Sequence, residues 1–171
     1  MVNDLKDIFD NVNNWLKFAE AKNGVIIALN SALIFGVFKV NLTLTDENIL
    51  RDYYIFMVIF VLLISTIMAL LSFIPRLKYP YIHFEKPNNN DNLLYFSDIS
   101  KYTSVQYYEK IQAVYNIKSD KKDFEMHYIN QIIINSKITF IKLKQFEIAI
   151  WFTLFAFLTP IGGLILYIAR K

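Results

Sequence analysis

Residues 54–74 form a run of 21 residues without a single charged side chain. A helix of that length extends about 31 Å, which matches the hydrocarbon layer of a bilayer. The run therefore predicts a transmembrane helix at about 54–74. The composition agrees, because 55% of the residues are hydrophobic and 16% are aromatic, more than a soluble domain of this size needs.

Two further apolar runs predict two more membrane helices. Residues 148–168 have the same length and contain Pro160, which a membrane helix tolerates as a kink. An alternative is a re-entrant hairpin around Thr159–Gly163, where Pro and Gly favour a turn. Residues 24–38 are shorter, and they reach membrane length, at about 24–40, if Lys22 and Lys39 extend their ammonium groups to the two interfaces.

The distribution of basic residues predicts the orientation. Segments 1–23 and 75–147 lie on one side of a three-span protein, and together they hold 14 of the 18 Lys and Arg residues. Because basic residues near helix ends resist translocation, this side is predicted to be cytoplasmic, as is the N-terminus. The C-terminal tip is then external, whereas the re-entrant alternative would keep Arg170 and Lys171 inside. The acidic residues that precede the first run argue against a cleaved signal peptide.

The chain is thus predicted to be an all-α membrane protein with three transmembrane helices. Residues 1–75 contain an N-terminal amphipathic segment and the first two spans. Residues 76–145 form a cytoplasmic helical hairpin inserted between the second and third spans. Residues 146–171 contain the third span.

Local signals place the two helices of the insertion. Thr103 and Gln106 have the spacing of a capping box and predict a helix that runs to about Ile117. Ser119 or Asp120 is predicted to cap a second helix, which meets neither Gly nor Pro before the third span. The residues expected along one side of the first helix are Val105, Tyr108, Ile111, Gln112 and Tyr115, and those along one face of the second are Ile129, Ile132, Ile133, Ser136, Phe140 and Leu143.

Small residues form a stripe along the first span at every fourth position: Gly24, Ala28, Ala32 and Gly36. Such a stripe allows another helix backbone to approach closely. Asn23 and Asn30 lie beside it, and an amide in hydrocarbon needs a partner. Ser65, Ala69 and Ser72 form a weaker small face on the second span. The stripe predicts packing among the chain's own helices, self-association of several copies, or both.

The sequence argues against an enzyme. It contains no Cys, and His83 and His127 each lack the spacing of a metal-binding or catalytic pair. No Gly-rich phosphate loop is present, and the acidic residues at 120–125 are typical of a helix N-terminus. We therefore expect no catalytic residue, no metal site and no cofactor.

Several blocks resemble the Pycsar effector transmembrane family of bacterial antiphage proteins. The first is Ala19-Glu20-Ala21-Lys22-Asn23-Gly24, continuing to Asn30, and the second is Asn92-Leu93-Leu94-Tyr95-Phe96-Ser97-Asp98-Ile99, followed by Tyr107-Tyr108-Glu109. The third runs from Gln131 to Ala149 into a Lys-rich helix. Ser97 replaces the Gly that is usual in the family, which puts a tight turn there in doubt.

The resemblance implies a membrane effector of the bacterial inner membrane that senses cUMP or cCMP and impairs membrane integrity, causing abortive infection. It also implies a homo-oligomer in the lipid bilayer that works with a nucleotidyl cyclase without the need for direct contact. An alternative class is a ligand-independent membrane scaffold, channel subunit or holin-like protein.

A cyclic mononucleotide needs cations for its phosphate and an aromatic face for its base. The candidate ligand residues are therefore Lys22, Asn23, Phe96, Lys101, Tyr107, Tyr108 and Lys137. A competing interpretation is that Tyr107 and Tyr108 pack the hairpin and that Lys101 is solvated.

Overall fold

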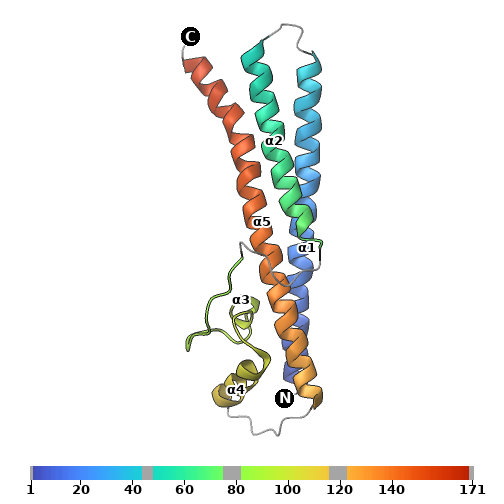
Figure 1. Ribbon diagram of the computed structural model, residues 1–171, viewed down its shortest axis with the longest axis vertical. Coiled ribbons are helices and arrows are strands. Elements are labelled where there is room, and N and C mark those ends of the chain that lie inside the picture. Colours follow the sequence, from blue (N-terminus) through green and yellow to red (C-terminus); the bar gives the residue numbers. More distant parts are fainter. Residues whose placement is uncertain (1, 44–47, 75–81, 116–122, 170–171) are drawn as a thin grey trace. The chain divides into compact units, whose positions relative to one another are not determined.

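The computed structural model describes residues 2–43, 48–74, 82–115 and 123–169, with the backbone alone for 161–169. It is 84% helical, and the described residues contain no strand, which confirms the all-α class. The helices, drawn in Figure 1, are α1 (Val2–Thr43), α2 (Ile49–Leu71), α3 (Phe96–Ile99), α4 (Ser104–Tyr115) and α5 (Asp123–Ala169).

α1 joins the expected N-terminal segment and the first span in one helix of 42 residues. No Pro interrupts it, and an interior glycine such as Gly24 weakens a helix by only about 1 kcal/mol relative to Ala. α2 begins five residues before the expected start because Asn48 caps it, with the Asn48 side-chain oxygen accepting a hydrogen bond from the Arg51 backbone N–H at 3.2 Å.

Among the described residues, α1 and α2 are long and apolar enough to span a membrane. α1 has 42 residues and α2 has 23, and each contains an apolar stretch of 18 residues with at most two charged side chains. The third expected span, 148–168, lies within α5, which confirms that the helix continues unbroken from the insertion and contains Pro160. Membrane crossing by this last segment stays a prediction.

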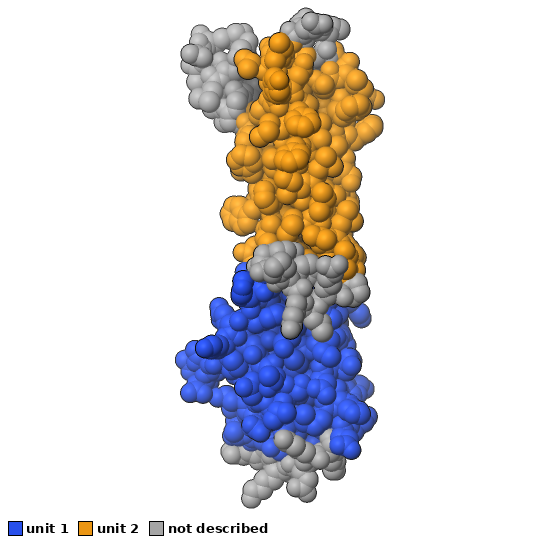
Figure 2. Space-filling view, viewed as in Figure 1, with its two compact units in different colours: residues 1–21, 75–144 blue, residues 22–74, 145–171 orange. Residues whose placement is uncertain are grey.

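The chain divides into two compact units, coloured separately in Figure 2. Unit 1 consists of residues 1–21 and 75–144, and unit 2 consists of residues 22–74 and 145–171. α1 and α5 each contribute to both units. The N-terminal segment therefore shares a unit with the insertion.

The core of unit 1 explains this grouping. α1 contributes Leu5, Ile8 and Val12, spaced three and four residues apart so that they share one face. The predicted α5 face is confirmed, since Ile129, Ile132 and Ile133 are buried in the same core and Ser136 is fully buried. The remaining buried members of this core are Leu93, Phe96, Ile99, Tyr102, Tyr107, Tyr108 and Ile111.

The buried face of α4 differs from the expected one. Tyr107, Tyr108 and Ile111 are buried, whereas Val105 and Tyr115 are 47% and 50% exposed. Tyr107 sets the rotation of the helix, because its hydroxyl donates a hydrogen bond to the Leu93 carbonyl at 2.5 Å inside the core. Tyr108 and Ile111 of the expected side are therefore buried, and Tyr107 joins them in the core.

The local signals of the insertion are largely confirmed. The Thr103 backbone N–H donates to Gln106 Oε1 at 3.1 Å, and the Gln106 N–H donates to Thr103 Oγ1 at 3.4 Å, which is the capping box. Ser97 is accommodated within the short helix α3, where the Ser100 hydroxyl donates to the Ser97 carbonyl at 2.6 Å. The expected caps Ser119 and Asp120 lie outside the described residues.

The core of unit 2 uses the small residues of α2. Ser65, Ala69 and Ser72 are buried, and Ala69 packs in one cluster with Ile26 of α1 and Ala149 of α5. A second cluster contains Val58, Leu62 and Ala156. Small side chains at these points let the three helix backbones approach one another.

Candidate functional site

The aromatic residues predicted to bind ligand are part of the unit 1 core. Phe96, Tyr107 and Tyr108 are at most 3% exposed. The Tyr108 hydroxyl accepts a hydrogen bond from the Gln112 amide at 3.0 Å. Burial also raises the pKa of the Tyr107 hydroxyl above its usual value. These rings support the insertion from within, and a ligand that touched them directly would have to open the core.

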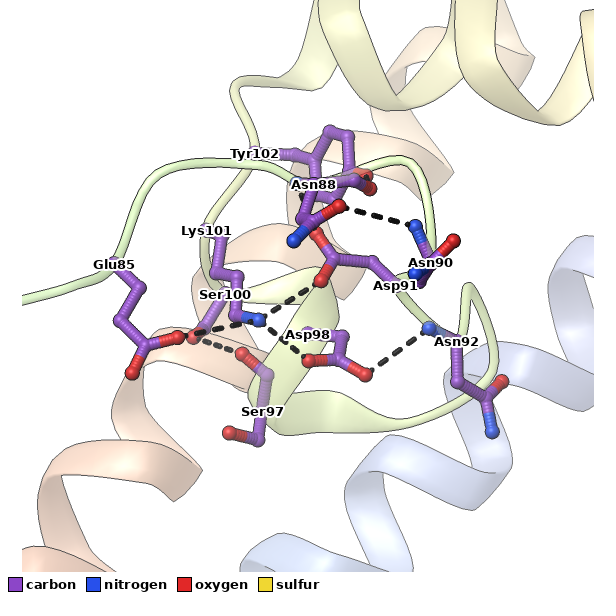
Figure 3. Close-up of polar contacts among 10 residues, drawn as sticks. All are labelled: Glu85, Asn88, Asn90, Asp91, Asn92, Ser97, Asp98, Ser100, Lys101 and Tyr102. Atoms are coloured by element: carbon purple, nitrogen blue, oxygen red, sulfur yellow. Dashed lines mark hydrogen bonds and ion pairs between the residues drawn. The ribbon is translucent and has the colours of Figure 1, made fainter.

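Lys101 lies in a cluster of carboxylates on the segment around α3 (Figure 3). Its ammonium is 2.7 Å from Asp98, 2.9 Å from Asp91 and 3.4 Å from Glu85. The Lys101 side chain is only 13% exposed, so it is not solvated as the competing interpretation held. An anionic ligand would compete with these three carboxylates for the ammonium.

Electrostatics follow from this arrangement. Hydrogen bonds to Asp98 and then Asp91 raise the pKa of the Lys101 ammonium well above its usual value. Burial acts to raise the pKa of the Asp91 carboxyl, but the Asn88 backbone N–H, 2.7 Å away, and Lys101 outweigh it, so this pKa lies below its usual value. Both groups are charged at neutral pH and hold the segment together.

Backbone contacts extend the cluster, as Figure 3 shows. The Asn92 N–H donates to Asp98 Oδ2 at 3.0 Å, and the Tyr102 hydroxyl donates to the Asn88 carbonyl at 3.1 Å. The cluster therefore fixes the irregular segment at 88–92 against α3.

The other predicted ligand residues have different neighbours. In unit 1, the Lys137 ammonium lies over the Phe84 ring, 5.9 Å from its centroid. Lys22 and Asn23 belong to unit 2. There the Lys22 ammonium is 4.9 Å from the centre of the Phe146 ring, and Asn23 is fully buried. The structure thus brings Phe96, Tyr107 and Tyr108 together and separates the lysines among different surroundings.

Lys142 forms a partly buried ion pair in unit 1. Its side chain is 9% exposed, and its ammonium binds Glu20 Oε1 at 3.0 Å. The Asn135 amide donates to Asn13 Oδ1 at 2.7 Å. These contacts pair the parts of α1 and α5 that belong to unit 1.

A buried polar cluster joins the three helices of unit 2. The Asn30 amide donates to the Ser65 hydroxyl at 2.8 Å, and the Thr153 hydroxyl donates to Asn30 Oδ1 at 2.8 Å. Ser65 in turn donates to the Ala149 carbonyl at 2.7 Å. Sequence reasoning identified Asn30 but missed Thr153. The available signal was its position as a hydroxyl side chain within an apolar run, where a polar group needs a partner.

Comparison with known families now settles the affiliation of the chain. The family model of PycTM, the Pycsar effector protein domain, matches residues 4–169. The chain belongs to this family. No curated protein and no solved structure matched it.

Membership identifies the chain as an antiphage defence effector, and the family is not a known enzyme family. The transmembrane domain of the family and the two apolar helices together indicate a membrane protein. In the described part of this Pycsar effector, no group of three His, Cys, Asp or Glu residues has a metal-binding arrangement.

The small-residue stripe of this effector is open within the chain. Ala28, Ala32 and Gly36 are exposed, and a methyl group added at Gly24 or Gly36 would meet nothing within 4 Å. Packing among the chain's own helices therefore does not occupy the stripe. The small face that the chain itself uses is the one on α2.

Proposed function

We propose that this effector senses a cyclic pyrimidine mononucleotide, cUMP or cCMP, and impairs the integrity of the bacterial inner membrane. The nucleotide comes from a partner cyclase during infection. The observation that carries the proposal is the family match over residues 4–169, together with helices α1 and α2 of membrane length.

The proposed topology has three spans, with the N-terminus and residues 76–145 in the cytoplasm. The proposed third span is residues 148–168 of α5. Unit 1 then contains the ligand-sensing part, and unit 2 contains the part that lies in lipid. Continuity of α5 from Asp123 supports direct coupling between them, because one helix contributes to both units.

Self-association is part of the proposal. The open face of Ala28, Ala32 and Gly36 supports it, because small residues at the surface of a membrane helix favour close approach of another helix. Ligand shifts the assembly only if it binds the assembled form more tightly than the resting one.

The seven predicted ligand residues remain proposals, and their proposed roles differ. Phe96, Tyr107 and Tyr108 shape the ligand-binding unit from its core. Lys101 contributes to binding only if the phosphate displaces a carboxylate. The other candidates, Lys22, Asn23 and Lys137, are tested best one at a time by ligand binding.

The deciding experiment uses the full-length protein in liposomes loaded with a fluorescent dye. Addition of cUMP or cCMP is expected to release the dye, whereas cAMP serves as the control nucleotide. Leakage without any nucleotide would favour the alternative of a ligand-independent channel or holin-like protein. A thermal shift with the same three nucleotides checks binding independently of leakage.

A further inference from the structure

The N-terminal part of α1 carries an exposed face of aromatic and amide side chains that the predicted ligand set does not include. Asn11, Asn14, Trp15 and Phe18 follow the spacing of one helical face and line a hollow of about 370 Å³ in unit 1. Phe18 is 46% exposed, and Asn11 and Asn14 are exposed as well. Large apolar side chains at a surface indicate a binding function when they form a continuous patch.

The aromatic rings here meet edge to face, with interplanar angles of 81° between Trp15 and Phe18 and 84° between Trp15 and Tyr95. The Trp15 and Phe18 ring centroids are 5.7 Å apart, and those of Trp15 and Tyr95 are 6.2 Å apart. Phe96 lies in the core and contacts Trp15 with a centroid distance of 5.2 Å. Tyr95 itself is 40% exposed. Trp15 is therefore held against the core by Phe96, and Phe18 and Tyr95 are partly exposed beside it.

The two amides differ in availability. The Asn11 amide nitrogen donates to the Leu94 carbonyl at 3.1 Å, which ties α1 to the segment before α3. No side-chain hydrogen bond within the described part of the chain engages Asn14. Its amide offers one acceptor and two donors, which match the hydrogen-bonding edge of uracil or cytosine.

Charge distinguishes this hollow from a second hollow in unit 1, at Asp4 and Asp7. A hollow of about 400 Å³ is lined by Asp4 and Asp7, whose carboxylates oppose an anionic nucleotide. The described residues that line the hollow at Trp15 are uncharged. Asn14 also lines another hollow, where Lys17 is accompanied by the carboxylates of Asp10 and Glu20.

We propose that Trp15, Phe18 and Asn14 form the site that receives the pyrimidine base. The base stacks on the face of one of the two rings, Trp15 or Phe18, and the Asn14 amide forms hydrogen bonds with the polar edge of the base. This inference rests on the proposed function and specifies where in unit 1 the nucleotide binds.

The test exploits the presence of only two tryptophans, Trp15 and Trp151. Trp151 is 67% exposed and belongs to unit 2, so Trp151→Phe leaves Trp15 as the single reporter without disturbing a core. The full-length variant in detergent micelles is titrated with cUMP and with cCMP. Equilibrium dialysis with radiolabelled nucleotide measures binding separately. We expect saturable quenching of Trp15 emission that follows the dialysis isotherm for the preferred nucleotide.

Substitutions locate the base. Asn14→Ala and Phe18→Ala are expected to weaken binding about tenfold or more, the range of one lost stacking or hydrogen-bonding contact. Asn130→Ala, an exposed amide on α5 in the same unit, is the matched control and is expected to bind as the parent does. Circular dichroism checks that each variant keeps its helices.

Three results overturn the inference. If dialysis shows binding while Asn14→Ala and Phe18→Ala bind normally and Trp15 emission is unchanged, the base lies elsewhere and the proposed function still stands. If Trp15 emission changes with protein concentration alone, this face belongs to a second copy of the chain. If dialysis detects neither nucleotide, the proposed function itself fails.

Discussion

The Asn30 amide of α1 donates a hydrogen bond of 2.8 Å to the Ser65 hydroxyl of α2, and both side chains are fully buried. Thr153 of α5 completes the cluster with a hydrogen bond to Asn30 Oδ1. One amide therefore contacts side chains from both other helices of unit 2, so its loss affects both helix pairs at once.

Asn30→Ala is expected to weaken association of these helices by about 1–2 kcal/mol, because Ser65 and Thr153 each lose a buried partner. The free energy of unfolding is measured by titrating the protein in mixed micelles with a denaturing detergent. Ser31→Ala is the control, since Ser31 is exposed and its hydroxyl donates to the Ile27 carbonyl of its own helix. Equal stability of the two variants would show that the cluster does not hold the helices together.

Asp91→Asn is expected to destabilise unit 1 at neutral pH by about 1–2 kcal/mol, because it removes a charge-assisted hydrogen bond to Lys101. The folded-state pKa of Asp91 is lowered from 3.8, so its stabilising contribution is present above that pH and is lost as the pH falls through the folded-state value. The difference in melting temperature between wild type and variant should therefore shrink below about pH 4. A difference that is constant between pH 7 and pH 3 would exclude the ion pair as its cause.

Replacing both Ala28 and Ala32 with Leu is expected to reduce the oligomer size of the protein in detergent while leaving membrane insertion intact. Both positions are exposed within the chain, so the added side chains interfere with close approach of another copy. Analytical ultracentrifugation measures the size, and Met57→Leu with Ile67→Leu on the exposed side of α2 serves as the control pair. If the Ala28 and Ala32 variant assembles like the control, the stripe does not mediate self-association.

Insertion of Gly-Gly after Gln145 is expected to preserve nucleotide binding but to weaken dye release from liposomes. The site follows the boundary between the two units, and each Gly weakens the helix by about 1 kcal/mol relative to Ala. Insertion of Ala-Ala at the same place changes the register equally but keeps the helix stiff, so it separates stiffness from rotation. Full release with Gly-Gly would show that α5 is not the coupling element.

Local chemistry made parts of the fold predictable. The Thr103 and Gln106 capping box needs only four consecutive residues, and the buried face of α5 follows from helical periodicity. The apolar run at 54–74 likewise predicted α2, and the absence of Gly and Pro before the third span predicted the continuity of α5. Each of these features depends on residues that are close together in the sequence.

Features that depend on distant residues were not predictable. Thr153 meets Asn30 across 123 positions, and periodicity does not say which face of each helix will meet the other. Lys101 was taken as solvated or ligand-binding because its partners Glu85 and Asp91 lie in an irregular segment whose path has no sequence period. The aromatic face at Trp15 was overlooked because its rings are divided between α1 and the segment before α3.

The core of unit 1 also has a consequence for biosynthesis. Leu5 and Val12 of α1 share that core with Ile129 and Ile132 of α5. The core therefore forms only when residues more than one hundred positions apart in the sequence come into contact. A ribosome synthesises the chain from its N-terminus. Contacts between residues far apart in the sequence form late, because closing the long intervening loop costs conformational entropy. α1 and α2 are therefore synthesised in full before the core of unit 1 can close. During that interval the nascent chain has its most apolar helix, α2, but lacks the α5 residues that complete this core.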